Sequence, residues 1–214
     1  MNKPIIFTDF DGTITTEDTL TGAILPYVDK KEFLEYNGKL ERGEMTLSAV
    51  VRYAYDDRPA QWLDGMLRYI DTVKIRPGFS KFLDDMEKRG IPVVVISGGF
   101  RQFSERKLAP YMKKITALHA VDMTVDGDKL KLVSGYDDGN ELLKKTDVMA
   151  LYDYDFAIGI GDSYTDKNMA KAVDRCFARD VLAAYLDKTG TPYIPYGDFT
   201  DVMKGIDKIL EEQK

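Results

Sequence analysis

Several residue types that would indicate particular chemistry are almost absent from this sequence. Its single cysteine, Cys176, excludes an intramolecular disulfide and a cysteine-rich zinc site. Its single histidine, His119, precedes a predicted hairpin rather than ending a buried strand, so we interpret it as structural. The net charge of -6 and the pI near 5.0 show no basic excess, so we do not expect nucleic acid as a partner.

Long apolar segments are missing as well. No stretch of about 18 apolar residues is present, so we expect no part of the chain to span a membrane. The apolar run at residues 5–7 is interrupted at Asp9 and is too short for the hydrophobic region of a signal peptide. We therefore expect a cytoplasmic protein. The 214 residues, 44% of them hydrophobic, are enough for one sizeable core, and the oligomeric state stays open.

Four short apolar runs are typical of strands that are buried on both faces. They cover residues 4–8, 92–96, 156–160 and 175–178. Patterns typical of helices lie between and after them, at residues 80–89, 103–112, 166–173, 181–188 and 200–212. Strands that alternate with helices in this way predict an α/β fold, with a Rossmann-like, doubly wound parallel sheet.

Two segments interrupt the alternation. Residues 15–75 contain no convincing strand and hold helical stretches at residues 31–40, 47–55 and 60–70, which predicts a helical insert after the first strand. The sheet domain would then comprise residues 1–14 and 76–214. The second interruption is residues 120–136, where Asp126 and Gly127 separate two alternating stretches and predict a hairpin.

Reactive side chains follow three of the predicted strands. The carboxyl ends of parallel strands meet at one edge of a sheet, where ligands bind, so these side chains are expected to converge. A pair of lysines lies between the second and third of these strands and is expected to join them. The residues are Asp9 and Asp11, Ser97 with Gly98 and Gly99, Lys144 and Lys145, and Asp162 with Asp166.

Carboxylates held this close together repel one another unless a cation neutralises them. Oxygen ligands indicate a hard ion, and Mg²⁺ is the natural candidate beside a phosphate. Asp9 and Asp162 can supply side-chain oxygens, and Asp11 can supply its main-chain carbonyl oxygen. Asp166 is assigned a supporting position behind these ligands.

The order of the motifs also indicates a reaction. Asp9 is placed to attack phosphorus and form an aspartyl-phosphate, and Asp11 to protonate the leaving oxygen and then activate water. Ser97 and the N–H groups of Gly98 and Gly99 can hold phosphate oxygens, while a lysine offsets their charge. Each motif alone has an ordinary explanation as a turn, a loop, a solvated face or a helix cap. Their joint occurrence at strand ends favours the catalytic interpretation.

With these motifs the chain resembles the haloacid dehalogenase superfamily of phosphatases. The resemblance rests on DFDGT at residues 9–13, VVVISGG with Ser97, a downstream lysine, and GDSYTD at residues 161–166. It implies Mg²⁺-dependent hydrolysis of a small phosphorylated metabolite through an aspartyl-phosphate on Asp9, and it implies that residues 15–75 form a cap that selects the substrate. Lys145 fits the start of a helix, where this family's lysine lies, and Lys144 is the alternative.

Two groups within this superfamily resemble the chain, and they predict different substrates. The insert resembles the cap of phosphoserine phosphatases, and Asp18 and Arg52 stand near the places of the acid and the arginine that hold serine. The acid there is typically Glu, whereas Glu17 is one position away. A structural role is the alternative for Arg52. Residues 176–180 and 194–199 instead resemble the methionine-salvage phosphatases, and we favour this group. Those enzymes often carry cysteines before the lysine of the third motif, whereas residues 134–143 contain none.

Three other functions use related features. A phosphotransferase or phosphomutase would use the same Asp9 and pass the phosphoryl group to a sugar hydroxyl. A non-enzymatic phosphate-binding module could share the acidic Mg²⁺ pocket, but it would not need Asp11, Ser97 and a lysine together with a cap. A dehalogenase is disfavoured by Asp11, because a leaving halide needs no proton.

Overall fold

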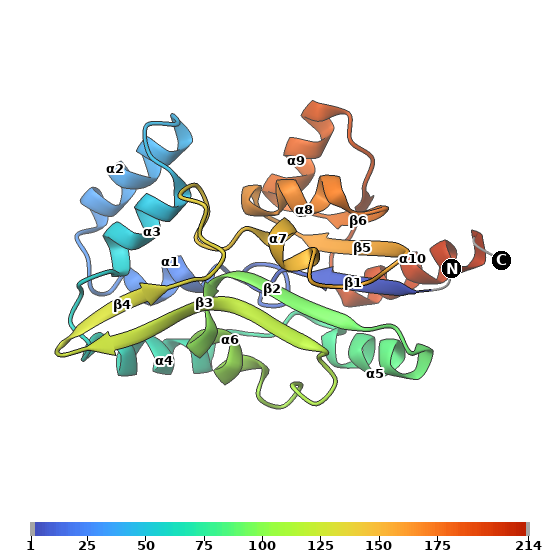
Figure 1. The fold of residues 1–214 in the computed structure, drawn as a ribbon, viewed down its shortest axis with the longest axis horizontal. Helices are drawn as coiled ribbons and strands as arrows, with labels where there is room; N and C mark the ends of the chain where they lie inside the picture. The colour runs from blue at the N-terminus through green and yellow to red at the C-terminus, as the bar shows by residue number, and fades with distance from the viewer. Residues whose placement is uncertain (1–2, 213–214) are drawn as a thin grey trace.

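The fold centres on a seven-stranded sheet in a computed structural model that describes residues 3–212. The strand order is β4-β3-β2-β1-β5-β6-β7 (Figure 1). The strands are β1 (Pro4–Thr8), β2 (Val93–Phe100), β3 (Ala117–Asp126), β4 (Lys129–Val133), β5 (Phe156–Gly161), β6 (Arg175–Ala178) and β7 (Ile194–Pro195). β3 and β4 pair antiparallel, and the other neighbours pair in parallel. The predicted α/β class is confirmed.

Helices cover both faces of this sheet because successive strand residues point to opposite sides. Ile6 of β1 packs in one apolar cluster with α5 (Phe79–Arg89) and α10 (Phe199–Glu212). Ile5 and Phe7 point the other way and pack in a second cluster with α7 (Lys145–Met149) and α8 (Lys167–Ala172). α6 (Arg101–Leu108) follows β2, and α9 (Asp180–Thr189) follows β6. The sheet is therefore covered by helices on both faces.

The segment between β1 and α5 is helical, as its pattern predicts. It contains α1 (Thr19–Ile24), α2 (Lys30–Glu41), α3 (Leu47–Tyr55) and α4 (Trp62–Thr72), which lie at one end of the sheet, on the left in Figure 1. Thr15 and Ile75 form a β-bridge, so the two ends of the segment lie together. The division at residues 15 and 75 stays a prediction. No helix within residues 3–212 is long and apolar enough to cross a membrane.

Several boundaries differ from the sequence expectation. β2 does not end before Ser97 but continues to Phe100, with a shift in its register against β3 between Ile96 and Phe100. α6 begins two residues before the predicted helix and ends before Pro110. A short 3₁₀ turn (Tyr164–Asp166) precedes α8, and the short elements α1 and β7 were not expected.

The predicted hairpin is present as β3 and β4. Gly127, at φ +61°, lies in the turn between them, a backbone conformation that favours glycine. His119 lies inside β3 rather than before it, and its Nε2 is 2.7 Å from the Tyr152 hydroxyl. The far half of the hairpin extends beneath α3 in Figure 1, and β4 contacts α3, so the hairpin lies close to the helical segment.

Candidate active site

The site lies where the central parallel strands end. β1 pairs with β2 on one side and β5 on the other, so residues that follow these strands are neighbours in space. Asp9 comes directly after β1, and its N–H donates to the Ile160 carbonyl at 2.9 Å. Ser97 lies in β2, and Asp162 comes directly after β5. The sheet thus brings three predicted site residues to one edge, as the parallel arrangement requires.

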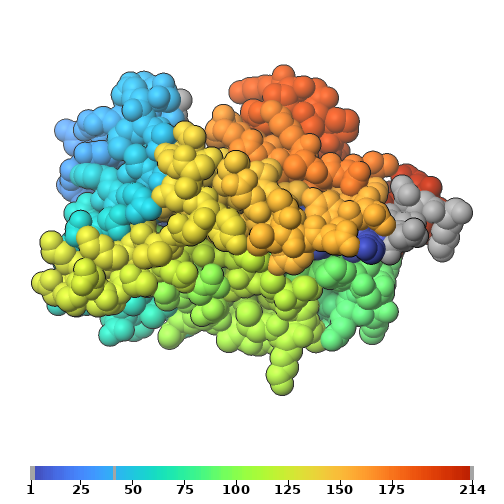
Figure 2. Space-filling view, viewed as in Figure 1, coloured from blue at the N-terminus to red at the C-terminus, as the bar shows by residue number. Residues whose placement is uncertain are grey.

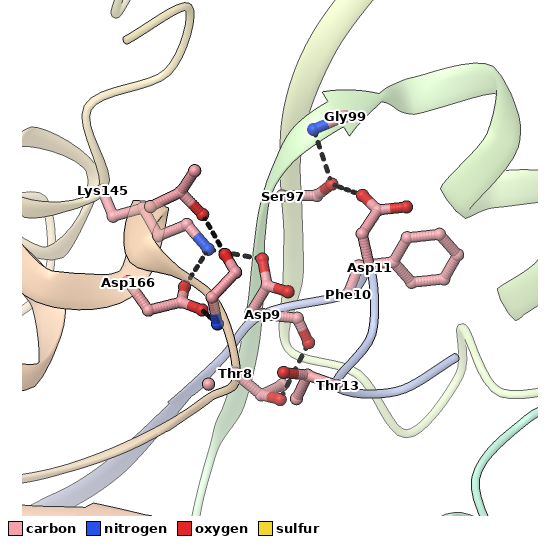
Figure 3. A network of polar contacts seen from close by, with 12 residues as sticks. Thr8, Asp9, Phe10, Asp11, Thr13, Ser97, Gly99, Lys145 and Asp166 are labelled. Carbon is pink, nitrogen blue, oxygen red and sulfur yellow. Dashed lines mark hydrogen bonds and ion pairs between the residues drawn. The ribbon is translucent and has the colours of Figure 1, made fainter. Parts of the chain in front are cut away.

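Asp9 is buried beside a lysine that is also buried. The Lys145 Nζ contacts Asp9 Oδ1 and lies 2.5 Å from Asp166 Oδ1 (Figure 3). Asp166 in turn accepts the main-chain N–H groups of Asp162 and Ser163 through Oδ2, each at 3.0 Å. These bonds hold the lysine and the loop after β5 in fixed positions relative to Asp9.

The two candidate lysines have different surroundings. Lys145 is the first residue of α7, and its side chain is 1% exposed. Lys144 precedes the helix, and its side chain lies at the surface, 3.1 Å from Asp147. The structure therefore brings Lys145, and not Lys144, to Asp9.

Asp11 is held by hydrogen bonds from three directions. Ser97 Oγ donates to Asp11 Oδ2 at 3.0 Å, while the Thr19 N–H, at 3.2 Å, and the Thr19 hydroxyl both donate to Oδ1. The Gly99 N–H donates to Ser97 Oγ at 2.9 Å. A Cβ at Gly99 would lie 2.5 Å from Asp11 Oδ2, so a larger residue there would have to displace the Asp11 carboxylate. Burial, and then the charge of Asp18, raise the pKa of Asp11 to about 6, against these hydrogen bonds.

Asp162 is positioned by the loop that follows Asp11. Thr13 Oγ1 donates to Asp162 Oδ1 at 2.7 Å. Gly12 adopts φ +76°, and a Cβ there would lie 2.3 Å from Asp162 Oδ2. The buried Arg76 holds this loop, because its guanidinium donates to the Gly12, Thr13 and Thr15 carbonyl oxygens. Only glycine therefore allows the loop to approach Asp162 this closely.

The cluster carries an excess of negative charge. Four carboxylates (Asp9, Asp11, Asp162 and Asp166) face one ammonium, which leaves a formal charge of -3 if all are ionised. Burial, and then the charge of Asp166, raise the pKa of Asp162 to about 7. Burial also raises the pKa of Asp9, although Lys145 acts in the opposite direction. A bound cation would relieve this repulsion.

The geometry of the carboxylates fits a hard cation. Oxygen atoms of Asp9, Asp162 and Asp166 lie within 4.8 Å of one another. Both Asp166 oxygens already accept hydrogen bonds, whereas among residues 3–212 no hydrogen bond reaches Oδ2 of Asp9 or Oδ2 of Asp162. Asp9 and Asp162 therefore suit direct ligation, and Asp166 suits a supporting position.

A cavity of about 160 Å³ opens above these groups. Its acidic floor meets a wall that is apolar, and Lys145 is the one cation among the described residues that line it. Glu141 also faces it. The lining residues are Asp9, Asp11, Asp18, Leu20, Leu47, Val51, Gly98, Gly99, Glu141, Leu142, Leu143, Lys145, Asp162, Ser163 and Thr165.

The two predicted specificity residues are placed differently. Asp18 lines the cavity, but its carboxylate also caps α1 by accepting from the Leu20 and Thr21 N–H groups. Arg52 does not line it. Its guanidinium is paired with Asp137 at 2.6 Å and with Asp56 at 2.9 Å, because its position on α3 directs it to the β4 side. The structure therefore does not bring Arg52 to the predicted substrate position.

Several residues of the site were not found from the sequence. Thr19 holds Asp11, Arg76 holds the loop after it, and Leu142 and Leu143 form part of the wall. In the sequence Arg76 is only the first residue after the predicted helical insert. A threonine or a leucine in a helix or loop carries no local signal, since its neighbours come from distant parts of the chain.

The fold and this site define a class of hydrolase. The haloacid dehalogenase-like hydrolase family matches residues 6–171, well over half of the chain. The chain therefore belongs to the haloacid dehalogenase-like hydrolases, which confirms the predicted family and the predicted enzyme class.

Particular relatives are more specific. A Microcystis aeruginosa protein named 2-hydroxy-3-keto-5-methylthiopentenyl-1-phosphate phosphatase is 34% identical over 200 residues, which cover 92% of this chain and 95% of that protein. A Bacillus cereus protein of the same name is 30% identical over 213 residues, covering 96% and 97%. These names agree with the subgroup favoured from the sequence.

Solved structures agree with the fold. A phosphoserine phosphohydrolase-like protein from Francisella tularensis superposes with a TM-score of 0.74 at 18% identity, covering 95% of this chain and 99% of that one. Phosphoserine phosphatase from T. onnurineus gives a TM-score of 0.71 at 20% identity, covering 95% and 94%. At these identities the likeness concerns the fold alone.

Proposed function

We propose that this protein is a Mg²⁺-dependent phosphomonoester hydrolase that forms an aspartyl-phosphate on Asp9. The observation that carries the proposal is the placement of two carboxylates in one small cavity. Asp9 and Asp11 both line it, and a buried lysine contacts only the first. Two carboxylates in different surroundings suit two roles, one as nucleophile and one as acid and base.

Asp9 Oδ2 and Asp162 Oδ2, together with the Asp11 carbonyl oxygen, are the proposed Mg²⁺ ligands. No hydrogen bond to that carbonyl oxygen is found in the described part of the chain, which leaves it available. When bound, Mg²⁺ would offset the charge of the phosphate and of the surrounding carboxylates. The oxygen-only ligand set matches the preference of this ion.

In the first step a carboxylate oxygen of Asp9 attacks phosphorus and the ester P–O bond breaks. Asp11 gives its proton to the leaving oxygen, so the alcohol departs neutral. In the second step Asp11 takes a proton from water as that water attacks phosphorus, which releases phosphate and restores Asp9. Lys145 offsets charge beside Asp9, and Ser97 keeps Asp11 oriented through its hydrogen bond.

The wall of the cavity favours a substrate with an apolar chain. Leu47, Val51, Leu142 and Leu143 are among the residues that line it. The named substrate of the relatives, 2-hydroxy-3-keto-5-methylthiopentenyl-1-phosphate, carries a methylthio end that suits such a wall. We propose this compound, or one with a similar uncharged chain, as the substrate.

Phosphoserine is the second candidate. Asp18 lines the cavity and could accept the ammonium of a serine. A serine carboxylate would also need a cation, and Arg52 already has two carboxylate partners. We therefore rank phosphoserine below a substrate without a carboxylate.

A phosphate-release assay with Mg²⁺ tests both levels of the proposal. We expect turnover of the methylthio substrate to exceed that of phosphoserine. Asp9→Asn should reduce release from either substrate to background, while the same substitution at the exposed Asp153 should leave it unchanged. Retained release in Asp9→Asn would refute the covalent mechanism, and a preference for phosphoserine would refute the substrate assignment alone.

A further inference from the structure

One loop of the sheet domain is tied closely to α3. This loop, residues 136–144, connects the end of the β3–β4 hairpin to α7, and its base is closed by the Lys144 N–H, which donates to the Tyr136 carbonyl at 3.0 Å. It supplies Glu141, Leu142 and Leu143 to the cavity. The space-filling view shows this yellow segment between the blue helices and the orange C-terminal part (Figure 2).

Most of the hydrogen bonds between the loop and α3 reach Asp137, and one reaches Asn140. Arg52 Nη2 donates to Asp137 Oδ2 at 2.6 Å, and Ser48 Oγ lies 3.3 Å from both Asp137 oxygens. The Ser48 N–H donates to the Asn140 carbonyl at 2.9 Å. The Asp137 side chain is 18% exposed, so solvent competes little for these bonds.

Arg52 is also fixed on its other side. Its Nη1 donates to Asp56 Oδ2 at 2.9 Å and to the Leu132 carbonyl at 3.2 Å, and the Leu132 N–H donates to Asp56 Oδ1 at 2.7 Å. The guanidinium is thus held at both ends by α3, β4 and the loop. Arg52 therefore links α3 to β4 and to the 136–144 loop.

Two adjacent stripes of α3 explain what this link does. Residues four apart lie on one face of a helix, so Leu47 and Val51 form one stripe, and Ser48 and Arg52 form the next. The first stripe lines the cavity, and the second contacts the loop. Contacts of the second stripe therefore set how far the first stripe lies from Leu142 and Leu143.

We propose that Arg52 and Asp137 form a latch that positions α3 against the 136–144 loop and sets the width of the substrate cavity. Arg52 is then a positioning residue and does not contact substrate. The proposal rests on the proposed function in so far as the cavity binds the substrate. The bonds themselves are open to measurement without turnover.

Kinetics distinguishes the latch from a substrate contact. Arg52→Ala and Asp137→Ala should each raise KM about tenfold, with kcat within about twofold, for both hexyl phosphate and phosphoserine. If Arg52 instead bound the carboxylate of the substrate, Arg52→Ala would raise KM for phosphoserine alone, and Asp137→Ala would leave KM unchanged. Loss of folded protein would lower kcat and leave KM unchanged.

The double variant and a charge exchange test the pairing directly. Arg52→Ala with Asp137→Ala should raise KM no more than about twofold beyond the worse single variant, because both remove the same contact. Arg52→Asp with Asp137→Arg should recover at least about threefold in KM over Arg52→Asp. Effects that multiply in the double variant, with no recovery on exchange, would overturn the latch.

Arg89 offers a matched control. It pairs with Asp85, four residues away in α5, at 2.8 Å and with Asp207 of α10, far away in the sequence, at 2.6 Å. Arg52 pairs in the same way with Asp56 and Asp137. Arg89 lies away from the cavity. Arg89→Ala should lower the thermal midpoint as Arg52→Ala does and leave KM unchanged.

Amide hydrogen exchange decides the latch whether or not phosphate is released. Exchange of the Ser48 amide should accelerate at least about tenfold in Arg52→Ala and in Asp137→Ala, and not in Arg89→Ala. Unchanged exchange at Ser48 would refute the latch, even if the phosphatase activity is present. Absence of phosphate release by the wild type would refute the proposed function, while the exchange result would still hold.

Discussion

Replacing Lys145 by methionine tests the charge balance at the centre of the site. The ammonium contacts both Asp9 and Asp166, and its side chain is 1% exposed. Methionine keeps most of the apolar stem and removes the charge. Two buried carboxylates then lose their common partner, which is the costliest way to break an ion pair.

Lys144, the neighbouring lysine, provides a control for the loss of stability in Lys145→Met. Removing one partner of a buried ion pair costs about 3–5 kcal/mol, and proton uptake by the stranded carboxyl keeps the cost near the lower end. Lys144 pairs with Asp147 at 3.1 Å, with side chains 37% and 50% exposed. Lys144→Met should therefore cost less than about 1 kcal/mol.

Urea and thermal unfolding of both variants, in chelator, measure the difference. We expect Lys145→Met to lower the free energy of unfolding by about 3 kcal/mol and the thermal midpoint by about 6–12 °C, for a chain of this size. Its phosphate release should fall at least about 100-fold, while Lys144→Met keeps wild-type turnover. Equal stabilities of the two variants, within about 1 kcal/mol, would refute the assignment of Lys145 as the partner of the buried carboxylates.

Three further predictions concern the groups around the acids. Arg76→Met should destabilise the protein by about 2–4 kcal/mol in urea unfolding, because three loop carbonyl oxygens lose a buried donor; a loss below about 0.5 kcal/mol would contradict this. Gly99→Ala should lower kcat/KM at least about tenfold, because a Cβ would lie 2.5 Å from Asp11 Oδ2; unchanged kinetics would show that Asp11 moves freely. Asp162→Asn should weaken Mg²⁺ binding by at least about tenfold in calorimetry, and equal affinity would remove Asp162 from the ligand set.

The convergence of the acids was predictable from one geometric rule. Asp9 and Asp162 each follow a run of apolar residues, and parallel neighbouring strands place such positions at the same edge. No knowledge of side-chain contacts was needed. The same rule places Ser97 nearby, although β2 continues through it, because the strand runs past the edge with a shift in register.

The partners of Arg52 could not be predicted in this way. Its helix was expected, but the face on which a helical residue finds its partner depends on the packing of that helix. Asp137 lies 85 positions away, in a loop without a regular pattern. The resemblance suggested a substrate contact, whereas local packing pairs the guanidinium with two carboxylates.

The choice between Lys144 and Lys145 depended on which of these two residues begins the helix. The first residue of α7 points inward to Asp9, and the residue before it points to solvent. Element ends are the least certain part of a sequence prediction, since several starts give similar local energies. The buried carboxylates select the position, because the Lys145 ammonium reaches Asp9 and Asp166 while that of Lys144 pairs with Asp147 at the surface.

The base of the 136–144 loop separates the two parts of the site. Lys145 follows the loop directly, so a movement of Asp137 could in principle displace the ammonium from Asp9. The Lys144 N–H closes the loop on the Tyr136 carbonyl, and Lys145 is held further by two buried carboxylates. A change at the latch is therefore absorbed within the loop, where Leu142 and Leu143 lie. For this reason latch variants should change the binding of the substrate chain and leave the chemistry at Asp9 intact.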